Sequence, residues 1–221
     1  MDVCNRYFLS GLFYQHEVFT QHYPEYQGIN LPEVSNYTLD EILSFYAKNI
    51  KDNAIVVAWS LAGIFSILLK EKFPTKIKKL ILVATSPKFM QFTDWSGISP
   101  NELKALIELY QGNENIFKNK FSKLTIYPNT LSHTGISKYI NTKKYYLNYL
   151  NLLKVMDVRV QFSKLSHDCH LILGDQDVLM KTPRDDIRKV NSQIKLAEIS
   201  GEGHAPFITN VLEFKKLLIA Q

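Results

Sequence analysis

Cysteine is scarce in this chain, and it has no long hydrophobic run. Cys4 and Cys169 are the only cysteines among 221 residues, which excludes a disulfide framework, and Cys169 sits in an apolar run typical of a core. No stretch approaches the roughly 18 apolar residues that a membrane span needs. The stretch YFLSGLFY (7–14) is too short for the core of a signal peptide. We therefore expect a soluble cytoplasmic protein that does not bind a membrane.

Internal repeats and low-complexity linkers are also absent, so the length favours one domain with a small insertion. Positive charge is concentrated in one part of the chain. Residues 100–165 hold ten Lys/Arg and four Asp/Glu, a net charge of +6, whereas the rest of the chain has a net charge of −1. Clustered positive charge attracts acidic partners. No nucleic-acid recognition motif accompanies this charge, so we do not expect a nucleic-acid partner.

Short apolar runs predict a parallel sheet whose strands are buried on both faces. Three are strong, NAIVVAWS (53–60), KKLILVAT (78–85) and CHLILG (169–174). Weaker candidates are 6–10, 26–30 and 194–200. Helical spacing of apolar residues predicts helices at 38–50, 61–73, 182–190 and 208–220, the first with a capping box formed by Thr38 and Glu41. Strands that alternate with helices indicate an α/β fold.

Residues 100–165 interrupt this alternation. NELKALIELY (101–110) and YINTKKYYLNYLNLLKVM (139–156) have helical patterns, and no buried strand is evident between them. We therefore predict a helical insertion between the strand that ends near Thr85 and the strand at 169–174.

Ser60 stands where a buried strand ends and a helix begins, in VVAWSLAGIF (56–65). A serine at such a corner is the usual hydrolase nucleophile, because the turn exposes the hydroxyl and points the next amide, here that of Leu61, toward an oxyanion. The usual corner is Gly-x-Ser-x-Gly, whereas Ala58 and Ala62 replace both glycines here. By itself, the stretch is equally compatible with an ordinary turn between strand and helix.

An acid and a histidine follow Ser60 in the chain order of an α/β-hydrolase triad. LILGDQDVLM puts Asp175 and Asp177 just past a buried strand, and ISGEGHAPF puts His204 in a glycine-flanked loop before the last helix. In a triad, histidine takes the serine proton and the acid holds the imidazole in the useful tautomer. Each residue alone could be a turn or surface residue. Their order favours a triad, and the greater reach of Asp177 favours it over Asp175.

FLSGLF (8–13) is a strand followed by a Ser-Gly turn near the N-terminus. In an α/β-hydrolase, the loop after this early strand supplies the second oxyanion amide. Leu12 is the residue at that position. Only its backbone amide is needed, so the side chains of this turn are free to vary.

Several stretches resemble the pimeloyl-[acyl-carrier protein] methyl ester carboxylesterases of biotin synthesis, which are α/β-hydrolases with a helical lid. VAWSLAG resembles their G-W-S-L-G-G elbow, and VATSPKFMQFTDWSGISP (83–100) resembles their lid entrance. GHAPFITNVLEF (203–214) is similar to the H-A-P-F-I segment around their catalytic histidine. The resemblance extends from about residue 7 to the C-terminus.

The resemblance implies an α/β-hydrolase fold with a trimmed, mostly parallel sheet of about six strands. The core would comprise 1–99 and 166–221, and the helical lid 100–165. The residues carried over as catalytic are Ser60, Asp177 and His204, with oxyanion amides from Leu12 and Leu61. Those implied near the acyl chain are Trp59, Phe121 and Thr125. Those implied to face an acidic carrier protein are Lys118, Lys120 and Lys123, where the family has arginines that bind carboxylates and phosphates in bidentate fashion.

The implied activity is hydrolysis of the methyl ester of pimeloyl-acyl-carrier protein by a monomeric enzyme without a metal or organic cofactor. Two other functions are compatible with the residues. One is a short-chain carboxylesterase that acts without a carrier protein. The other is a catalytically silent α/β-hydrolase that serves as a binding protein, which the alanine-flanked elbow and the trimmed N-terminus would suit.

Overall fold

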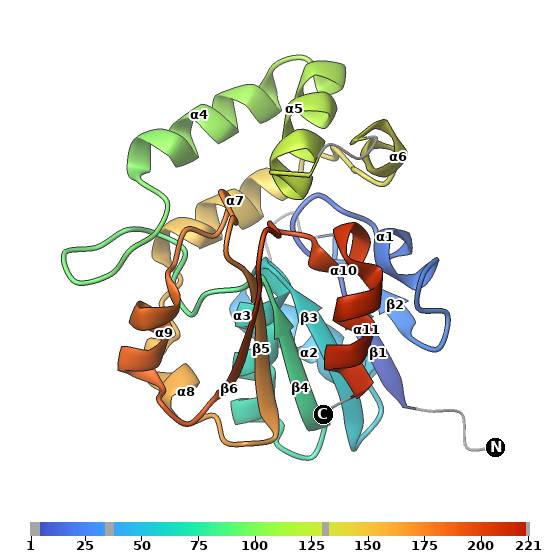
Figure 1. Ribbon diagram of the computed structural model, residues 1–221, viewed down its shortest axis with the longest axis vertical. Helices are drawn as coiled ribbons and strands as arrows, with labels where there is room; N and C mark the ends of the chain where they lie inside the picture. The colour runs from blue at the N-terminus through green and yellow to red at the C-terminus, as the bar shows by residue number, and fades with distance from the viewer. Residues whose placement is uncertain (1–4, 34–37, 130–132, 220–221) are drawn as a thin grey trace.

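A six-stranded parallel sheet forms the centre of the computed structural model, which describes residues 5–33, 38–129 and 133–219 (Figure 1). The strand order is β2-β1-β3-β4-β5-β6, and each neighbouring pair is parallel. The strands are β1 (Arg6–Leu9), β2 (Gln27–Ile29), β3 (Ala54–Trp59), β4 (Ile77–Val83), β5 (Cys169–Gly174) and β6 (Lys195–Ile199). Five of the six lie within stretches that the sequence predicts, including the three weaker ones, and β4 begins one residue before its predicted stretch at 78–85.

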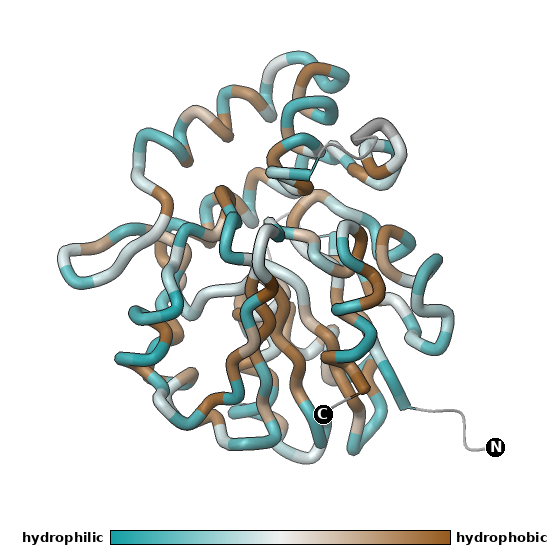
Figure 2. The backbone as a smooth tube through the Cα atoms, viewed as in Figure 1, coloured by the Kyte–Doolittle hydropathy of each residue, from teal (hydrophilic) through white to brown (hydrophobic). Residues whose placement is uncertain are grey.

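The three central strands, β3, β4 and β5, are buried along most of their length. Figure 2 shows them as a hydrophobic centre surrounded by more hydrophilic helices and loops. Such burial requires helices on both faces of the sheet, as parallel sheets have. Cys169 begins β5 as a buried free thiol, as its apolar surroundings predict, whereas Cys4 lies outside the described residues.

Helices cover both faces of the sheet (Figure 1). Behind it lie α2 (Leu39–Asn49) and α3 (Leu61–Lys72). Helix α8 (Arg159–Ser163) packs beside α3, and α9 (Arg184–Val190) packs beside α8. In front lie α10 (Pro206–Thr209) and α11 (Val211–Ile219), with α1 (Glu17–Thr20) beside α10. The predicted capping box of α2 is confirmed, because Thr38 accepts from the Glu41 amide and Glu41 accepts from Thr38.

Four upper helices stand above the carboxyl ends of the strands (Figure 1). They are α4 (Pro100–Gln111), α5 (Glu114–Ile126), α6 (His133–Ser137) and α7 (Tyr146–Val155). The chain leaves and re-enters the sheet layer at adjacent points, where the Val158 amide donates to the Pro87 carbonyl at 2.8 Å. Lys88 and Asp157 form an ion pair of 2.9 Å at the same place. The division into a core and a lid at residues 100–165 stays a proposal, and α8, although inside that range, packs beside α3.

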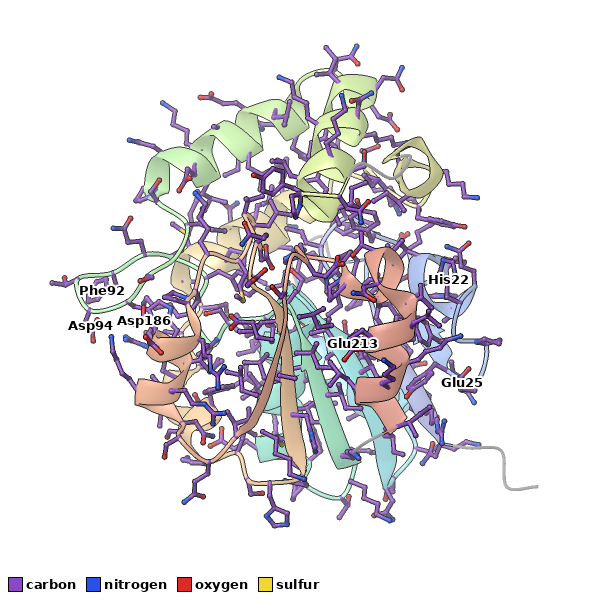
Figure 3. All side chains as sticks on the ribbon, viewed as in Figure 1. His22, Glu25, Phe92, Asp94, Asp186 and Glu213 are labelled. Carbon is purple, nitrogen blue, oxygen red and sulfur yellow. The ribbon has the colours of Figure 1, made fainter. Side chains whose placement is uncertain are left out.

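The loop between β4 and α4 projects to one side, with Phe92 and Asp94 near its tip (Figure 3). Asp186 of α9 lies next to it and accepts a hydrogen bond from the Ser96 amide at 3.2 Å. Trp95 donates from its indole nitrogen to the Lys88 carbonyl at 2.7 Å, which closes the loop on itself. This loop is thus fixed to α9 before the chain enters α4.

Two predicted helices differ from those observed. The helix predicted at 139–156 begins only at Tyr146, because Tyr139 lies in a turn and Ile140 forms an antiparallel bridge with Tyr14 of the loop after β1. The helix predicted at 208–220 is divided at Asn210 into α10 and α11, and its last predicted residue, Ala220, lies outside the described residues. In addition, α5 and the short helices α1, α6 and α8 were not predicted. Within the described ranges, no helix is long and apolar enough to cross a membrane.

Candidate active site

Ser60 occupies a strained corner between β3 and α3. Its φ of 56° and ψ of −126° lie where L-residues are rare, and such a conformation persists only when neighbouring contacts hold it. The Ser60 amide donates to the Val83 carbonyl at 2.9 Å, and the Ser60 carbonyl accepts from the Thr85 hydroxyl at 2.6 Å. Ala58 and Ala62 are both fully buried here, so the corner forms with alanine in place of both usual glycines.

His204 connects Ser60 to Asp177. The His204 Nε2 lies 2.9 Å from the Ser60 Oγ, and the Nδ1 lies 2.7 Å from an Asp177 Oδ. The side chains of His204 and Asp177 are 6% and 2% exposed. The other Asp177 oxygen accepts from the amides of Leu179 and Met180 at 2.8 and 2.9 Å. The structure thus brings together the three residues that the chain order suggested.

Asp175, the competing acid, has hydrogen-bond partners other than His204. Its carboxylate accepts from the Gly201 amide at 2.7 Å and from the Ser200 hydroxyl at 3.2 Å. Asp175 therefore braces the turn that precedes the His204 loop. Two aspartates that are two residues apart thus have separate partners, since only Asp177 contacts the imidazole.

The loop after β1 carries Leu12, the expected oxyanion donor. The amides of Leu12 and Leu61 have no acceptor among the described residues, and both residues line the cavity beside Ser60. The loop turns sharply, because Phe13 has a φ of 69° and the Ser10 hydroxyl donates to the Tyr14 carbonyl at 2.6 Å. Two free amides next to Ser60 are what an oxyanion site requires.

Residues 139–141 hold this loop in place from above. The Asn141 amide donates to the Phe13 carbonyl at 2.7 Å, and the Gln15 amide donates to the Tyr139 carbonyl at 2.9 Å. The Phe13 ring is enclosed by aromatic residues of the upper helices at centroid distances of 4.9 to 5.2 Å, namely Tyr110, Phe117, Phe121 and Tyr146. The upper helices therefore fix the geometry of the expected oxyanion amides.

An apolar cavity of about 40 Å³ lies beside Ser60 and His204. Trp59 and Phe121, two of the residues expected near an acyl chain, line it. The others that line it, apart from Leu12 and Leu61, are Tyr14, Phe89, Ile98, Leu106, Leu153 and Leu179. Thr125 lies behind this wall, where its hydroxyl accepts from the Tyr14 hydroxyl at 3.1 Å and donates to the Phe121 carbonyl at 2.8 Å.

Trp59 and Tyr14 position the site in ways that the sequence did not reveal. The Trp59 indole nitrogen donates to the His204 carbonyl at 2.8 Å, which ties the histidine loop to the serine corner. Burial raises the pKa of the Tyr14 hydroxyl, so this group stays protonated and able to donate. Thr85 was also missed, although its position at the end of the predicted strand 78–85 was a signal that it lies near Ser60.

The three lysines predicted to face a carrier protein lie on α5. Lys118 is partly buried and pairs with Glu114 of the same helix at 2.6 Å. Lys120 and Lys123 are exposed, and so are Leu124 and Tyr127. One side of α5 therefore presents both positive charge and apolar surface to solvent.

Curated relatives share much of this sequence. A pimeloyl-[acyl-carrier protein] methyl ester esterase from Pseudoalteromonas atlantica is 28% identical over 188 residues, which are 80% of this chain and 73% of the relative. One from Shewanella oneidensis is 26% identical over 210 residues, 90% of this chain and 79% of the relative. This chain resembles the pimeloyl-[acyl-carrier protein] methyl ester esterases over most of its length. The resemblance noted from short stretches is confirmed. No protein-family model matches the chain.

Solved structures share the fold. An esterase from Exiguobacterium antarcticum superposes with a TM-score of 0.83 at 16% identity, covering 98% of this chain and 91% of that one. A bromoperoxidase from Bacillus anthracis gives 0.80 at 15% identity, covering 97% and 90%. The fold is that of the α/β-hydrolases, as predicted.

Proposed function

We propose that this chain is a serine carboxylesterase that hydrolyses the methyl ester of pimeloyl-acyl-carrier protein in biotin synthesis. The observation that carries the proposal is the pair of hydrogen bonds from His204 to Ser60 and Asp177, at the wall of an apolar cavity. The similarity to esterases named for that substrate supports the choice of ester. The proposal includes a cytoplasmic location for the enzyme.

The mechanism proceeds through an acyl-enzyme. Ser60 attacks the ester carbonyl while His204 Nε2 accepts the hydroxyl proton, and Asp177 stabilises the imidazolium that results. The amides of Leu12 and Leu61 donate to the oxyanion. His204 then protonates the departing methoxide, so methanol leaves. A water molecule, deprotonated by the same nitrogen, releases the free carboxylate and restores Ser60.

The carrier protein would dock on α5. Its acidic surface would be attracted by Lys120 and Lys123, with Lys118 adding charge beside them. Trp59, Phe121 and Thr125 would surround the acyl end, the first two by contact and Thr125 by holding Tyr14 and the Phe121 backbone. A single copy of the chain contains every group that this mechanism uses.

Ser60→Ala tests the proposal on methyl pimeloyl-acyl-carrier protein. We expect the rate of ester hydrolysis to fall by about 10⁴-fold or more, because no nucleophile remains. Full activity in this variant would contradict the mechanism. Labelling of wild-type Ser60 by an organophosphonate distinguishes the enzyme from a silent binding protein. Restored growth without biotin, in cells that lack their own esterase of this kind, would support the pathway.

A short-chain carboxylesterase is the second candidate, and the small size of the cavity favours it. About 40 Å³ beside Ser60 suits a short acyl group without rearrangement. The ratio of kcat/KM for carrier-linked methyl pimelate to that for methyl acetate separates the two functions. A ratio below one would favour the short-chain esterase.

A further inference from the structure

A pocket of about 390 Å³ lies on the front face of the sheet, beside α11. Residues of β1, β3 and β4 form its floor, and α11 and residues 23–26 form its walls. Glu25, one of these wall residues, lies at the side of α11 (Figure 3). Ile55, near the start of β3, is in the floor, whereas Ser60 follows the end of the same strand, about 16 Å away. We call this separate space the α11 pocket.

Three cationic side chains from different elements line the α11 pocket. They are Arg6 of β1, Lys79 of β4 and Lys215 of α11. Arg6 is in register with Ile55, and Ile55 with Lys79, so the two cations lie in one row on one face of the sheet, with Cα atoms about 10 Å apart. Glu25 is the one acid among the described residues of the lining, which therefore has a formal net charge of +2.

Arg6 and Lys79 lack the acidic partners that comparable cations have in this molecule. Lys70, Lys76 and Lys88 are also partly buried, and each pairs with an aspartate at 2.7 to 2.9 Å. Within the described ranges, neither the Arg6 nor the Lys79 side chain forms an ion pair or a hydrogen bond, and the Arg6 Nε is buried without a partner. Buried donors almost always have partners in folded proteins. The α11 pocket therefore offers donors to an acceptor that the described residues do not supply.

Aromatic rings hold two of the cations at the walls. The Arg6 guanidinium lies 5.9 Å from the centroid of the Tyr26 ring, and the Lys215 Nζ lies 5.4 Å from that of Tyr23. Such a contact uses the face of the ring and leaves the N–H groups able to donate. The Tyr23 hydroxyl donates to the Phe207 carbonyl at 3.1 Å, which fixes this wall to α10. The cations are thus positioned before any ligand binds.

The charge of the α11 pocket matches a phosphate monoester. Such a group carries nearly two negative charges at neutral pH, whereas a carboxylate carries one. A guanidinium presents paired N–H groups that fit phosphate oxygens. Burial, followed by the positive charge of Lys195, lowers the pKa of Lys79, so positive charge is in excess on this face of the sheet. A bound dianion would offset that excess.

Apolar surface in the α11 pocket points to an organic ligand. Ile55 and Ile81 form part of the floor, and Leu218 and Ile219 line the wall on α11. The Ile219 side chain is 83% exposed. An inorganic anion would leave these side chains uncovered, whereas an organic body would remove them from water. The volume of the pocket is also in the range of sites for small molecules.

We infer that the α11 pocket binds a phosphate monoester with an apolar body, at a site separate from Ser60. The phosphate would accept from Arg6 and Lys79, and Lys215 would approach it from α11. The organic part would lie against Ile81. This inference does not rest on the proposed function, because it involves no group that the ester chemistry uses.

Titration of the full chain with phenyl phosphate at pH 7.5, followed by calorimetry, tests the inference. We expect saturable binding to the wild type. Lys79→Gln should raise the Kd by about tenfold, because a hydrogen bond to a charged group is lost. Lys78→Gln is the matched control and should leave the Kd unchanged, because adjacent residues of a strand point to opposite faces of the sheet.

A second pair of variants keeps the test valid if Lys79→Gln does not fold. Lys215 and Lys216 are both exposed on α11, and Lys216 pairs with Glu213. Lys215→Gln should raise the Kd for phenyl phosphate by about threefold, the size of an exposed charge interaction, while Lys216→Gln leaves it unchanged. The unfolding temperature of each variant shows whether the fold is retained.

Inorganic phosphate and phenol, titrated in parallel, separate the two parts of the ligand. Each should bind at least about tenfold more weakly than phenyl phosphate, because each lacks either the apolar body or the charge. Equal affinity for inorganic phosphate would overturn the organic body, and equal affinity for phenol would overturn the anion. Absence of saturable binding of phenyl phosphate, or equal effects of the target and control substitutions, would overturn the site itself.

Discussion

At the scale of single residues, Asp175 and Asp177 show that one loop can give two identical side chains different hydrogen-bond partners and different roles. Asp177 receives two backbone amides on one oxygen and His204 on the other, whereas Asp175 receives Gly201 and Ser200. The first arrangement orients an imidazole, and the second fixes a turn. Substitution of each aspartate in turn therefore separates two effects on activity. One is the orientation of His204, and the other is the stability of the loop that carries both aspartates.

Asp177→Asn should lower kcat by about 10⁴-fold while the fold is retained, because an amide supports the wrong imidazole tautomer. Asp175→Asn, the matched control, should lower kcat by less than about tenfold, because the turn keeps an acceptor oxygen for the Gly201 amide. The measurement is kcat on methyl acetate, with the unfolding midpoint of each variant. Equal losses in the two variants would contradict the assignment of Asp177 as the acid.

The sequence predicts the candidate catalytic residues better than it predicts the residues that hold them in position. Ser60, Asp177 and His204 were predicted from their order and from the strand ends that they follow. Contacts such as Thr85 to the Ser60 carbonyl and Trp59 to the His204 carbonyl were not. They depend on how adjacent strands align and on the course of one loop, and neither leaves a residue pattern in the chain.

At the scale of elements, α5 contacts three separate parts of the candidate site. Thr125 bonds Tyr14 of the loop after β1, and Phe121 lines the cavity. The Tyr127 carbonyl, just past the end of α5, lies so close to Gly203 that a Cβ there would collide with it. This last contact connects α5 to the loop of His204, and it requires glycine.

Gly203→Ala should therefore displace either α5 or the His204 loop. We expect kcat on methyl acetate to fall by about a hundredfold, because displacement of a catalytic group by about 1 Å has this effect. Gly135→Ala in α6 is the control, since no atom of the described residues lies within 4 Å of the position of its added Cβ. Wild-type kcat and unfolding temperature in Gly203→Ala would contradict the close contact.

The helices that the sequence did not predict correctly are the ones that tertiary contacts define. Residues 139–141 have a helical pattern, but their backbone bonds to residues 13–15 around the bridge of Ile140 with Tyr14, because the loop after β1 needs backbone partners. Helix α5 has four charged residues, and two of its five buried residues, Ser122 and Thr125, are polar, which weakens its apolar pattern. By contrast, α2 and α3 have strong local patterns and form where predicted.

At the scale of the whole molecule, the parallel sheet was predictable because its strands are simple apolar runs. Each of the six stretches predicted as strands contributes one strand to the observed sheet, and the predicted α/β-hydrolase fold is confirmed. The cavity beside Ser60 was not predictable, because residues from more than four separate segments line it. The packing that forms the sheet also buries titratable residues unrelated to the site, and His170 is one of them.

His170 on β5 makes the stability of the whole fold depend on pH. Its side chain is nearly buried, and this burial, with Lys195 and Lys79 nearby, lowers its pKa from 6.5 to about 4. Between these values the unfolded chain binds more protons than the folded chain, so the free energy of unfolding falls as the pH falls from 6.5 to 4. Asp168 opposes this effect only weakly.

His170→Gln should remove this contribution. We expect the loss of unfolding free energy between pH 7 and pH 5 to be smaller in the variant than in wild type, by on the order of 1 kcal/mol, measured by urea unfolding at both pH values. The absolute stability at pH 7 is not the readout, since glutamine changes the packing. An identical loss in the two proteins would contradict the low pKa of His170.

The upper helices are attached to the rest of the molecule by more contacts at α5 than at the start of α4. On the fixed side, α5 and residues 139–141 are bonded to the loop after β1, and Tyr127 abuts Gly203. On the other side, the start of α4 meets the Asp177 loop through the ion pair of Glu102 with Lys181. Substrate entry would then move α4 while α5 stays in place. A carrier protein docked on α5 would then stay bound throughout the catalytic cycle. Entry of the acyl chain into the site and dissociation of the carrier protein would therefore be separate kinetic steps.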